Sequence, residues 1–310
     1  MKTPVLFCIY NRPEVTARVF SQLAQIRPER LLVIADGPRP EVSGDAEKVA
    51  ATRAVIDRID WPCELTTDYS SLNLGCRIRM ASGISWAFEQ EDELIILEDD
   101  CLPDESFFGF CEQLLQRYRS DARITSICGT NFQPARNTIH SYYFSRWAHV
   151  WGWATWKRAW DTYDVDINSW PGWRSKRQLK SVVDSLEEYR LWHHVFDNQY
   201  AGHNDTWDFP WLYNCWMQDG LTIIPSVNLV SNIGFGSDAT HTTDPEAPLA
   251  NRPVKSIGRL SHPGVIERDQ AADKWTYENM FAQMMPAVPQ RANRLKRLGK
   301  KIRSVFRRAG

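Results

Sequence analysis

A short apolar run that ends in three consecutive carboxylates constrains this chain more than any other segment. Leu94–Leu97 predicts a buried strand, and Glu98, Asp99 and Asp100 follow it without a break. In open α/β sheets, ligands bind at the carboxyl ends of the strands. Three adjacent carboxylates repel one another, and a hard cation with oxygen ligands, Mg²⁺ or Mn²⁺, would neutralise them. Taken alone, the triplet fits an exposed acidic turn equally well.

A helix is expected directly after the acidic triplet. Pro103 breaks the chain, and Asp104 can cap a helix whose apolar residues include Phe107, Phe108, Leu114 and Leu115. A strand, an acidic loop and a helix in this order are typical of a site for a metal and a diphosphate.

Strand-like and helix-like segments alternate over the first part of the chain. This alternation predicts an α/β fold with a Rossmann-like, largely parallel sheet flanked by helices. The strands are expected at residues 4–9, 31–35, 63–67 and 94–97, and the helices after the first strand, at residues 50–59 and from 75 to about 88, with a polar loop at 39–48. The polar residues after these strands would converge on one edge of the sheet.

The second half differs in composition, since 11 of the 14 tryptophans lie between Trp147 and Trp216. We predict strands at 124–128, 142–144 and 221–224, and helices at 155–163 and 187–198. Residues 1–290 are expected to form one domain, with a donor half to about 130, an acceptor half at about 131–245 and an irregular extension at 246–290.

Charge and cysteine content exclude several classes of protein. Nine Lys and Arg residues and no acid lie in 291–310, so the remaining residues carry 28 basic against 38 acidic side chains. The body of the chain is therefore not a nucleic-acid binder. Seven cysteines without CxxC spacing argue against a zinc site or a disulfide framework. The chain has neither a GxGxxG nor a GxxxxGK[ST] motif, so the sequence does not support a dinucleotide-binding site or a P-loop nucleotide-binding site.

Two polar residues stand after the first two predicted strands. Arg12 follows the first strand, where a guanidinium can clamp a diphosphate, although a solvated loop arginine is the more common case. Asp36 ends the second strand, where a carboxylate can accept a hydrogen bond from a nucleobase N–H. Asp36 could equally be a turn residue before Gly37.

Residues 203–211 place two carboxylates among large aromatic rings. Desolvation raises a carboxylate pKa, which suits a general base that takes a proton from a sugar hydroxyl. For Asp208 this role and a structural one are evenly balanced, whereas Asp205 is expected to be a helix N-cap.

The aromatic cluster and a glycine-containing loop are further candidates. Trp147, Trp151, Trp153, Trp156 and Trp160 could stack on sugar rings, but core packing is the favoured interpretation for most of them. The loop at residues 232–241 could close over a bound diphosphate and bring its last residue, His241, to the diphosphate or the metal. A lone loop histidine is usually just exposed.

In their order, these segments resemble the metal-dependent GT-A glycosyltransferases, in particular those related to the N-acetylglucosaminyltransferase I family. The resemblance implies a bacterial-type, family-2-like enzyme that uses nucleotide-diphospho-sugars. The resemblance covers roughly residues 4–242. It rests on Pro4–Leu23 with Asn11-Arg12, Asp36, Glu98-Asp99-Asp100 as the EDD version of the DXD motif, Pro103–Phe110, His149–Trp153, Trp207-Asp208 with Trp211, and Ile224-Pro225 through Gly236.

Two features depart from that family pattern. Phe209-Pro210 stands where the family tends to have polar or acidic residues. The amino-terminal membrane anchor of the eukaryotic members is also not found in this sequence.

The resemblance implies a role for each donor-side residue. Asp36 would hold the nucleobase, Asp99 the ribose, and Asp100 the Mn²⁺ or Mg²⁺ that bridges the diphosphate. His241 would support the diphosphate or the metal. The remaining donor-binding candidates are Arg12 and Glu98.

The implied activity is inverting glycosyl transfer, with Asp208 as general base. The donor would be a nucleoside-diphosphate sugar, with UDP favoured and UDP-GlcNAc considered, and the acceptor a hydroxyl of a glycan or lipid-linked molecule in cell-surface polysaccharide synthesis. One alternative is a sugar-1-phosphate nucleotidyltransferase, although Tyr10–Pro13 replaces its glycine-rich loop. The other is a catalytically inactive sugar-binding scaffold protein.

The carboxyl-terminal residues 291–310 predict a basic amphipathic helix. Leu295, Leu298, Ile302, Val305 and Phe306 recur at spacings of three and four, and basic residues occupy the other faces. Such a helix binds anionic membrane surfaces; a disordered basic tail or a nucleic-acid contact is the alternative. With no signal peptide and no apolar run near the ~20 residues of a membrane span, we expect a cytoplasmic protein associated peripherally with the inner face of the membrane.

Overall fold

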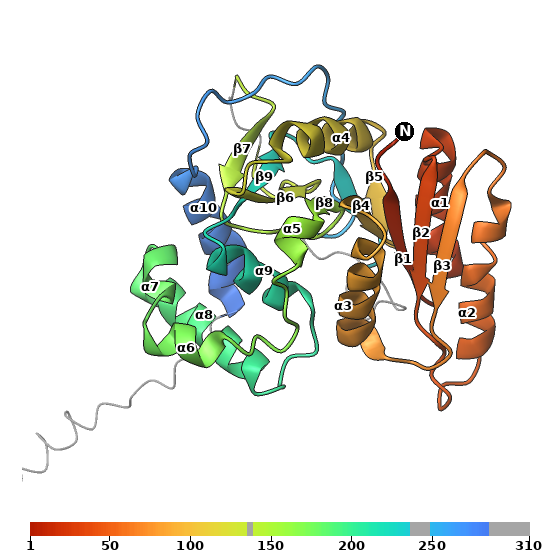
Figure 1. Cartoon of the computed structure of the whole chain (residues 1–310), viewed down its shortest axis with the longest axis horizontal. Helices are drawn as coiled ribbons and strands as arrows, with labels where there is room; N and C mark the ends of the chain where they lie inside the picture. Colours follow the sequence, from red (N-terminus) through yellow and green to blue (C-terminus); the bar gives the residue numbers. More distant parts are fainter. Residues whose placement is uncertain (135–138, 236–248, 285–310) are drawn as a thin grey trace, which may run out of the picture.

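The computed structural model describes residues 1–134, 139–235 and 249–284. His241 and the tail at 291–310 therefore lie outside the described residues. An eight-stranded sheet runs through the molecule in the order β3-β2-β1-β4-β8-β6-β9-β7 (Figure 1). Its strands are β1 Val5–Ile9, β2 Arg30–Ala35, β3 Glu64–Tyr69, β4 Glu93–Glu98, β6 Ile124–Cys128, β7 Tyr142–Ser145, β8 Trp153–Trp156 and β9 Leu221–Pro225.

The first half of the sheet is parallel throughout. β1 pairs with β2 and β4, and β2 pairs with β3, all in parallel register. The helices between these strands are α1 Pro13–Ile26, α2 Asp45–Arg53 and α3 Gly75–Phe88, and α4 Ser106–Tyr118 follows β4. The predicted α/β fold class, a Rossmann-like and mostly parallel sheet flanked by helices, is confirmed.

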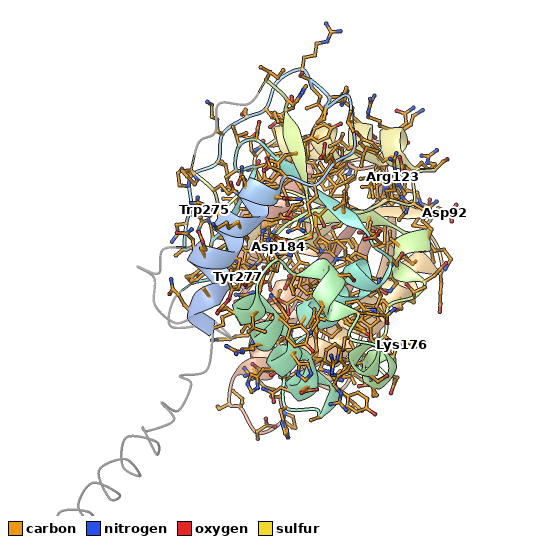
Figure 2. The ribbon with its side chains drawn as sticks, turned by 90° about the vertical axis from the view of Figure 1, so that its left-hand side faces the viewer. Asp92, Arg123, Lys176, Asp184, Trp275 and Tyr277 are labelled. Atoms are coloured by element: carbon orange, nitrogen blue, oxygen red, sulfur yellow. The ribbon has the colours of Figure 1, made fainter. Side chains whose placement is uncertain are left out.

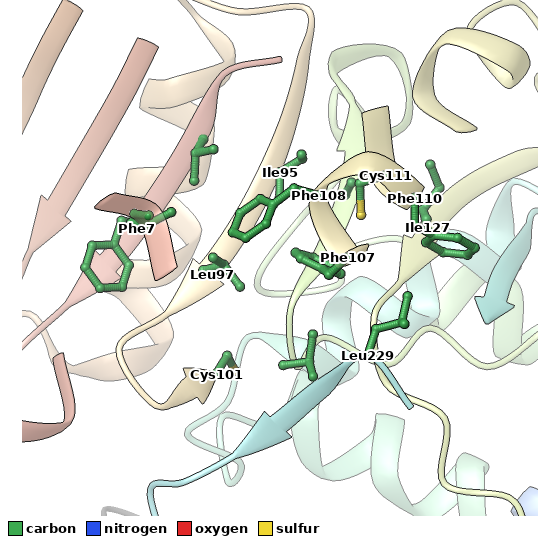
Figure 3. Close-up of a cluster of buried hydrophobic side chains, with 14 of the residues drawn as sticks. Phe7, Ile95, Leu97, Cys101, Phe107, Phe108, Phe110, Cys111, Ile127 and Leu229 are labelled. Carbon is green, nitrogen blue, oxygen red and sulfur yellow. The ribbon is translucent and has the colours of Figure 1, made fainter. Parts of the chain in front are cut away.

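Alternate residues of each central strand pack on opposite faces of the sheet. Val5, Phe7 and Ile9 of β1 belong to a core shared with α1 and α4, whereas Leu6 and Cys8 pack toward α3 and α9 (Asp208–Met217). Figure 3 shows the aromatic side chains of α4 lying between β4 and β6. Burial on both faces explains why β1 and β4 are continuous apolar runs with no polar alternation.

The predicted helix at 155–163 is wrong in its first part. Residues Trp153–Trp156 form β8, which pairs antiparallel with both β4 and β6, and only Lys157–Trp160 is helical as α5. Threonine and tryptophan fit a strand when partners lie on both sides. β8 thus joins the parallel half of the sheet to the second half.

The predicted helix at 50–59 begins earlier than expected. α2 starts at Asp45, after Gly44 at a φ of 78°, and a short 3₁₀ turn at Ile56–Arg58 follows it. Part of the expected polar loop at 39–48 is therefore helical. The predicted helices after β3 and at 187–198 (α8, Leu186–Tyr200) are confirmed.

Residues 249–284, which the sequence predicted to be irregular, contact the second half of the fold through a buried carboxylate. Asp273 of α10 (Gln270–Thr276) is fully buried and accepts hydrogen bonds from Ser145 Oγ at 2.5 Å and from the Arg268 guanidinium. Arg268 also pairs with Asp184, and Figure 2 shows Asp184 beside this C-terminal helix. Through α10, the segment is packed against the second half of the fold.

The other described elements are short. They are the helices α6 Trp170–Ser175 and α7 Leu179–Val182, a π-helical turn at Tyr277–Phe281, a 3₁₀ turn at Ala282–Met284, and the two-stranded sheet of β5 Cys101–Pro103 and β10 Val230–Asn232. Within the described ranges, no helix has the length and apolar character needed to cross a membrane.

Candidate active site

A cavity of about 360 Å³ opens at the carboxyl ends of β1, β2 and β4. This volume is within the range of small-molecule sites, and the position is the ligand-binding edge of open α/β sheets. The predicted convergence of the strand ends is confirmed. The cavity residues are Cys8, Ile9, Tyr10, Arg12, Ile34, Asp36, Arg39, Asn73, Gly75, Cys76, Arg79, Met80, Glu98, Asp99, Asp100, Trp151, Asp205, Asn232, Gly234 and Phe235.

The acidic triplet lies at the end of β4 and faces this cavity. Asp99 is buried and accepts a hydrogen bond from the backbone N–H of Tyr10 at 3.1 Å. Burial raises the pKa of Asp99 to about 6, against the opposing effect of the Arg12 charge. Burial, together with the charges of Asp100 and Asp99, also raises the pKa of Glu98 well above its usual range. Crowding and burial of these carboxylates therefore favour a bound proton or a nearby positive charge.

Arg12 supplies positive charge to two of these carboxylates. Its Nη2 contacts Asp99 Oδ1 and lies 3.0 Å from Asp100 Oδ2. Arg12 is the N-cap residue of α1, and Pro13 is the first residue of that helix. Arg12 is therefore not the solvated loop arginine that was the alternative interpretation, and its role toward a diphosphate stays a prediction.

Asp36 lies in the cavity wall, with its oxygens bonded to the chain itself. Oδ1 accepts from the backbone N–H groups of Gly37 and Leu74, each at 2.9 Å, and Oδ2 accepts from Gly75 N at 2.9 Å and Asn73 Nδ2 at 3.2 Å. These donors include the first amides of α3, which have no partner within the helix. Asp36 therefore fixes the start of α3, and its bond to a nucleobase stays a prediction.

A second buried carboxylate, which the sequence did not single out, organises the same wall. Asp45 accepts from Tyr10 Oη at 2.9 Å, Asn11 Nδ2 at 2.7 Å and Arg39 Nη2 at 2.7 Å. The Arg39 hydrogen bond holds the pKa of Asp45 well below its usual range. Asn73 Nδ2 also donates to Tyr10 Oη at 3.0 Å, which joins this network to the Asp36 wall.

Of the two carboxylates at 203–211, only Asp205 lines the cavity, and the role of Asp208 as general base stays a prediction. Asp205 does not cap a helix: α9 begins at Asp208, and Asp205 is exposed and lines the cavity. Asp208 accepts hydrogen bonds from Thr206 Oγ1 and, at 2.8 Å, from Phe209 N. Asp208 is not among the cavity-lining residues, but its charge contributes to the raised pKa of Glu98.

The segment after β10 lies directly over the acidic triplet. Ile233 N donates to Asp100 O at 2.8 Å, and Asn232 Oδ1 accepts from Gly234 N at 2.9 Å. A Cβ at residue 234 would lie only 2.2 Å from Asp100 Oδ2, so only glycine allows this approach. Phe235 follows, with its ring centroid 5.8 Å from that of Trp151.

Most of the tryptophan cluster belongs to the core, as expected. Trp147, Trp153, Trp156 and Trp160 are buried, whereas Trp151 is half-buried and reaches the cavity. Among the described residues no group of three or more His, Cys, Asp and Glu side chains is arranged to hold a metal. A cation at Asp100 would therefore need other ligands in addition to the described side chains.

No protein-family model and no curated protein matches the sequence. Among solved structures, Staphylococcus aureus TarS 1–349 aligns with a TM-score of 0.38 and 12% identity over 53% of this chain and 50% of that chain. UDP-glucose pyrophosphorylase complexed with UDP-glucose aligns at 0.28 and 11% identity over 47% of this chain and 62% of that chain.

A third solved structure, 4-diphosphocytidyl-2C-methyl-D-erythritol synthase from Anaerococcus prevotii, aligns at a TM-score of 0.33 with 8% identity, over 63% of this chain and 82% of that chain. The aligned part spans half of the TarS chain. All three TM-scores are below 0.5, so these similarities assign neither a family nor an activity to this chain.

Proposed function

We propose that this chain is a metal-dependent, inverting glycosyltransferase. It would move a sugar from a nucleoside-diphosphate sugar, with UDP favoured and UDP-GlcNAc as the first candidate, to a hydroxyl of a glycan or lipid-linked acceptor. One observation carries the proposal: a single cavity at the strand ends is lined by the acidic triplet, by Arg12 and by Asp205 of the loop that leads to Asp208.

The proposed cation would be held by a single described carboxylate and by the oxygens of a bound diphosphate. Asp100 is the proposed ligand, because its carboxylate is partly exposed to the cavity and already attracts a positive group. When bound, Mn²⁺ or Mg²⁺ would act as a Lewis acid and neutralise charge on the departing diphosphate. His241 stays a candidate second ligand from outside the described residues.

The donor would lie between the acidic triplet and the wall built by Asp36. Asp99 would accept from the ribose, and the wall around Tyr10 and Asn73 would face the nucleobase. Arg12 would bind diphosphate oxygens, since its planar guanidinium suits bidentate contact with phosphate.

Asp208 is the proposed general base for a single displacement. The proton of the acceptor hydroxyl passes to the Asp208 carboxylate, and the hydroxyl oxygen bonds to the anomeric carbon from the side opposite the diphosphate. The bond from that carbon to the diphosphate oxygen breaks, and the nucleoside diphosphate leaves with the electron pair. One such displacement inverts the anomeric configuration.

A screen of nucleotide sugars tests the proposal directly. We expect a UDP-sugar with Mn²⁺ to raise the melting temperature and to be consumed, with release of UDP, when a glycan acceptor is added. Formation of pyrophosphate from a sugar 1-phosphate and a nucleoside triphosphate would instead identify a nucleotidyltransferase. Binding of nucleotide sugars without turnover on any acceptor would identify a sugar-binding scaffold protein.

We also propose that residues 291–310 attach the protein to an anionic membrane surface, where lipid-linked acceptors lie. Each basic residue near such a surface contributes roughly 1 kcal/mol. A chain ending at Pro289 should stay folded and keep its activity on a soluble acceptor, but should no longer sediment with anionic liposomes. Full-length protein should sediment, and less at high salt. Equal sedimentation of both chains would show that the tail is not the anchor.

A further inference from the structure

Arg12 occupies the position of a counter-ion at the carboxylates that the proposed function assigns to the donor and the metal. One guanidinium nitrogen, Nη2, serves both Asp99 and Asp100. The exposed fractions of the three side chains are only 16% for Arg12, 4% for Asp99 and 16% for Asp100. Little water is available to replace either partner, so the pair is strong enough to compete with an incoming cation.

From this geometry we propose that Arg12 is an internal counter-ion that disfavours metal binding at Asp100 until a diphosphate arrives; the inference rests on the proposed function. A divalent cation alone would have to approach Asp100 against the adjacent guanidinium charge, and the cation and Arg12 would compete for the same carboxylate. A diphosphate offers the guanidinium two new anionic oxygens, so Asp100 becomes free as the metal arrives.

The backbone at Gly234 lies close to the ion pair between Arg12 and Asp100. A Cβ at residue 234 would lie 2.7 Å from Arg12 Nη1 as well as 2.2 Å from Asp100 Oδ2. Gly234 is held in place by its bond to Asn232, whose strand pairs with Cys101 next to Asp100. The residue 234 backbone thus lies close to both partners of the pair, and the open space next to Arg12 is the cavity, where the diphosphate is expected.

The inference predicts that metal and nucleotide strengthen each other's binding. Because such coupling is reciprocal, UDP should increase Mn²⁺ affinity by the same factor by which Mn²⁺ increases UDP affinity. We expect about tenfold or more for the native protein, within the usual range of coupling between two ligands. With Arg12 replaced by an uncharged residue, most of this coupling should disappear.

Calorimetric titration of Mn²⁺, alone and with saturating UDP, tests the inference. Arg12→Gln should bind Mn²⁺ alone about tenfold more tightly than the native protein, since a repelling charge is removed, and should gain little more from UDP. Arg39→Gln is the matched control, because it removes a cavity arginine that pairs with Asp45 and not with the triplet. Its Mn²⁺ affinity should change far less.

Two further variants test whether the change in Mn²⁺ affinity arises at Asp100 and whether it depends on the charge of residue 12. Combining Arg12→Gln with Asp100→Asn should abolish the gain in Mn²⁺ affinity, which would place the gain at Asp100. Arg12→Lys keeps a charge without the planar guanidinium and should lie between the native protein and Arg12→Gln. Circular dichroism checks that each variant is folded.

The outcomes separate this inference from the proposed function. Unchanged or weaker Mn²⁺ binding by Arg12→Gln and Arg12→Lys would overturn the counter-ion role, even if the native protein binds Mn²⁺ with UDP. Tighter Mn²⁺ binding by Arg12→Gln supports competition at the carboxylates. Failure of the native protein to bind any nucleoside diphosphate with Mn²⁺ would overturn the proposed donor class and, with it, release of Arg12 by a diphosphate.

Discussion

Asp100→Ala should abolish glycosyl transfer while leaving the fold intact. A cation that stabilises the departing diphosphate contributes several kcal/mol to the transition state, so its loss should cost about a thousandfold or more in rate. Stability should change little, because the substitution removes one charge from a crowded acidic cluster and Asp99 keeps its contact with Arg12. Turnover measured with Mn²⁺, with thermal unfolding in parallel, checks both statements.

Asp104→Ala is the matched control for this variant. Asp104 lies four residues further along, just before the N-cap Glu105 of α4, and accepts from Ser106 N at 2.9 Å and from Ser256 Oγ at 2.8 Å. Loss of these hydrogen bonds should lower stability by about 1 kcal/mol and leave turnover unchanged. EDTA should silence the native protein and Mn²⁺ should restore it; full activity in EDTA would show that transfer needs no metal.

The second large effect is expected at Asp208. Removal of a general base costs about 10²–10⁴ in rate, so Asp208→Asn should lose turnover but keep its donor affinity. The asparagine oxygen can still accept from Thr206 and Phe209, so the start of α9 should remain in place. Rates with saturating donor, together with donor titrations, separate the chemical step from binding.

Asp205→Asn is the comparison that decides which carboxylate acts. It should have the smaller effect if Asp208 is the base, although Asp205 is the residue that lines the cavity. A dead Asp205→Asn together with a normal Asp208→Asn would transfer the role to Asp205. In that case the loop before α9, and not its first turn, would supply the base.

The central strands and the site edge could be predicted because their signals are local. β1 and β4 are short apolar runs buried on both faces, and each ends at the polar residues that face the cavity. Parallel strands bring their carboxyl ends to one edge, so Arg12, Asp36 and the acidic triplet were expected to converge. This expectation needed no knowledge of distant contacts.

The parts that could not be predicted depend on partners far away in the chain. Trp153–Trp156 becomes a strand because β4 and β6 lie on either side, although its own spacing resembles the start of a helix. Asp45 stands in a polar stretch, and its importance comes from Tyr10 and Asn11, 35 and 34 residues before it. Asp205 looks like a capping residue until the start of α9 is known.

The place of β8 in the middle of the sheet determines how this protein can be divided. If the chain were cut after β6, β4 would lose its antiparallel neighbour and expose an apolar edge, since Leu94–Leu97 are fully buried in the intact molecule. Such unpaired edges pair with other chains and aggregate. The half that carries the proposed donor site is therefore not a portable module, and chimeras that exchange the proposed acceptor half must keep β8 together with β4.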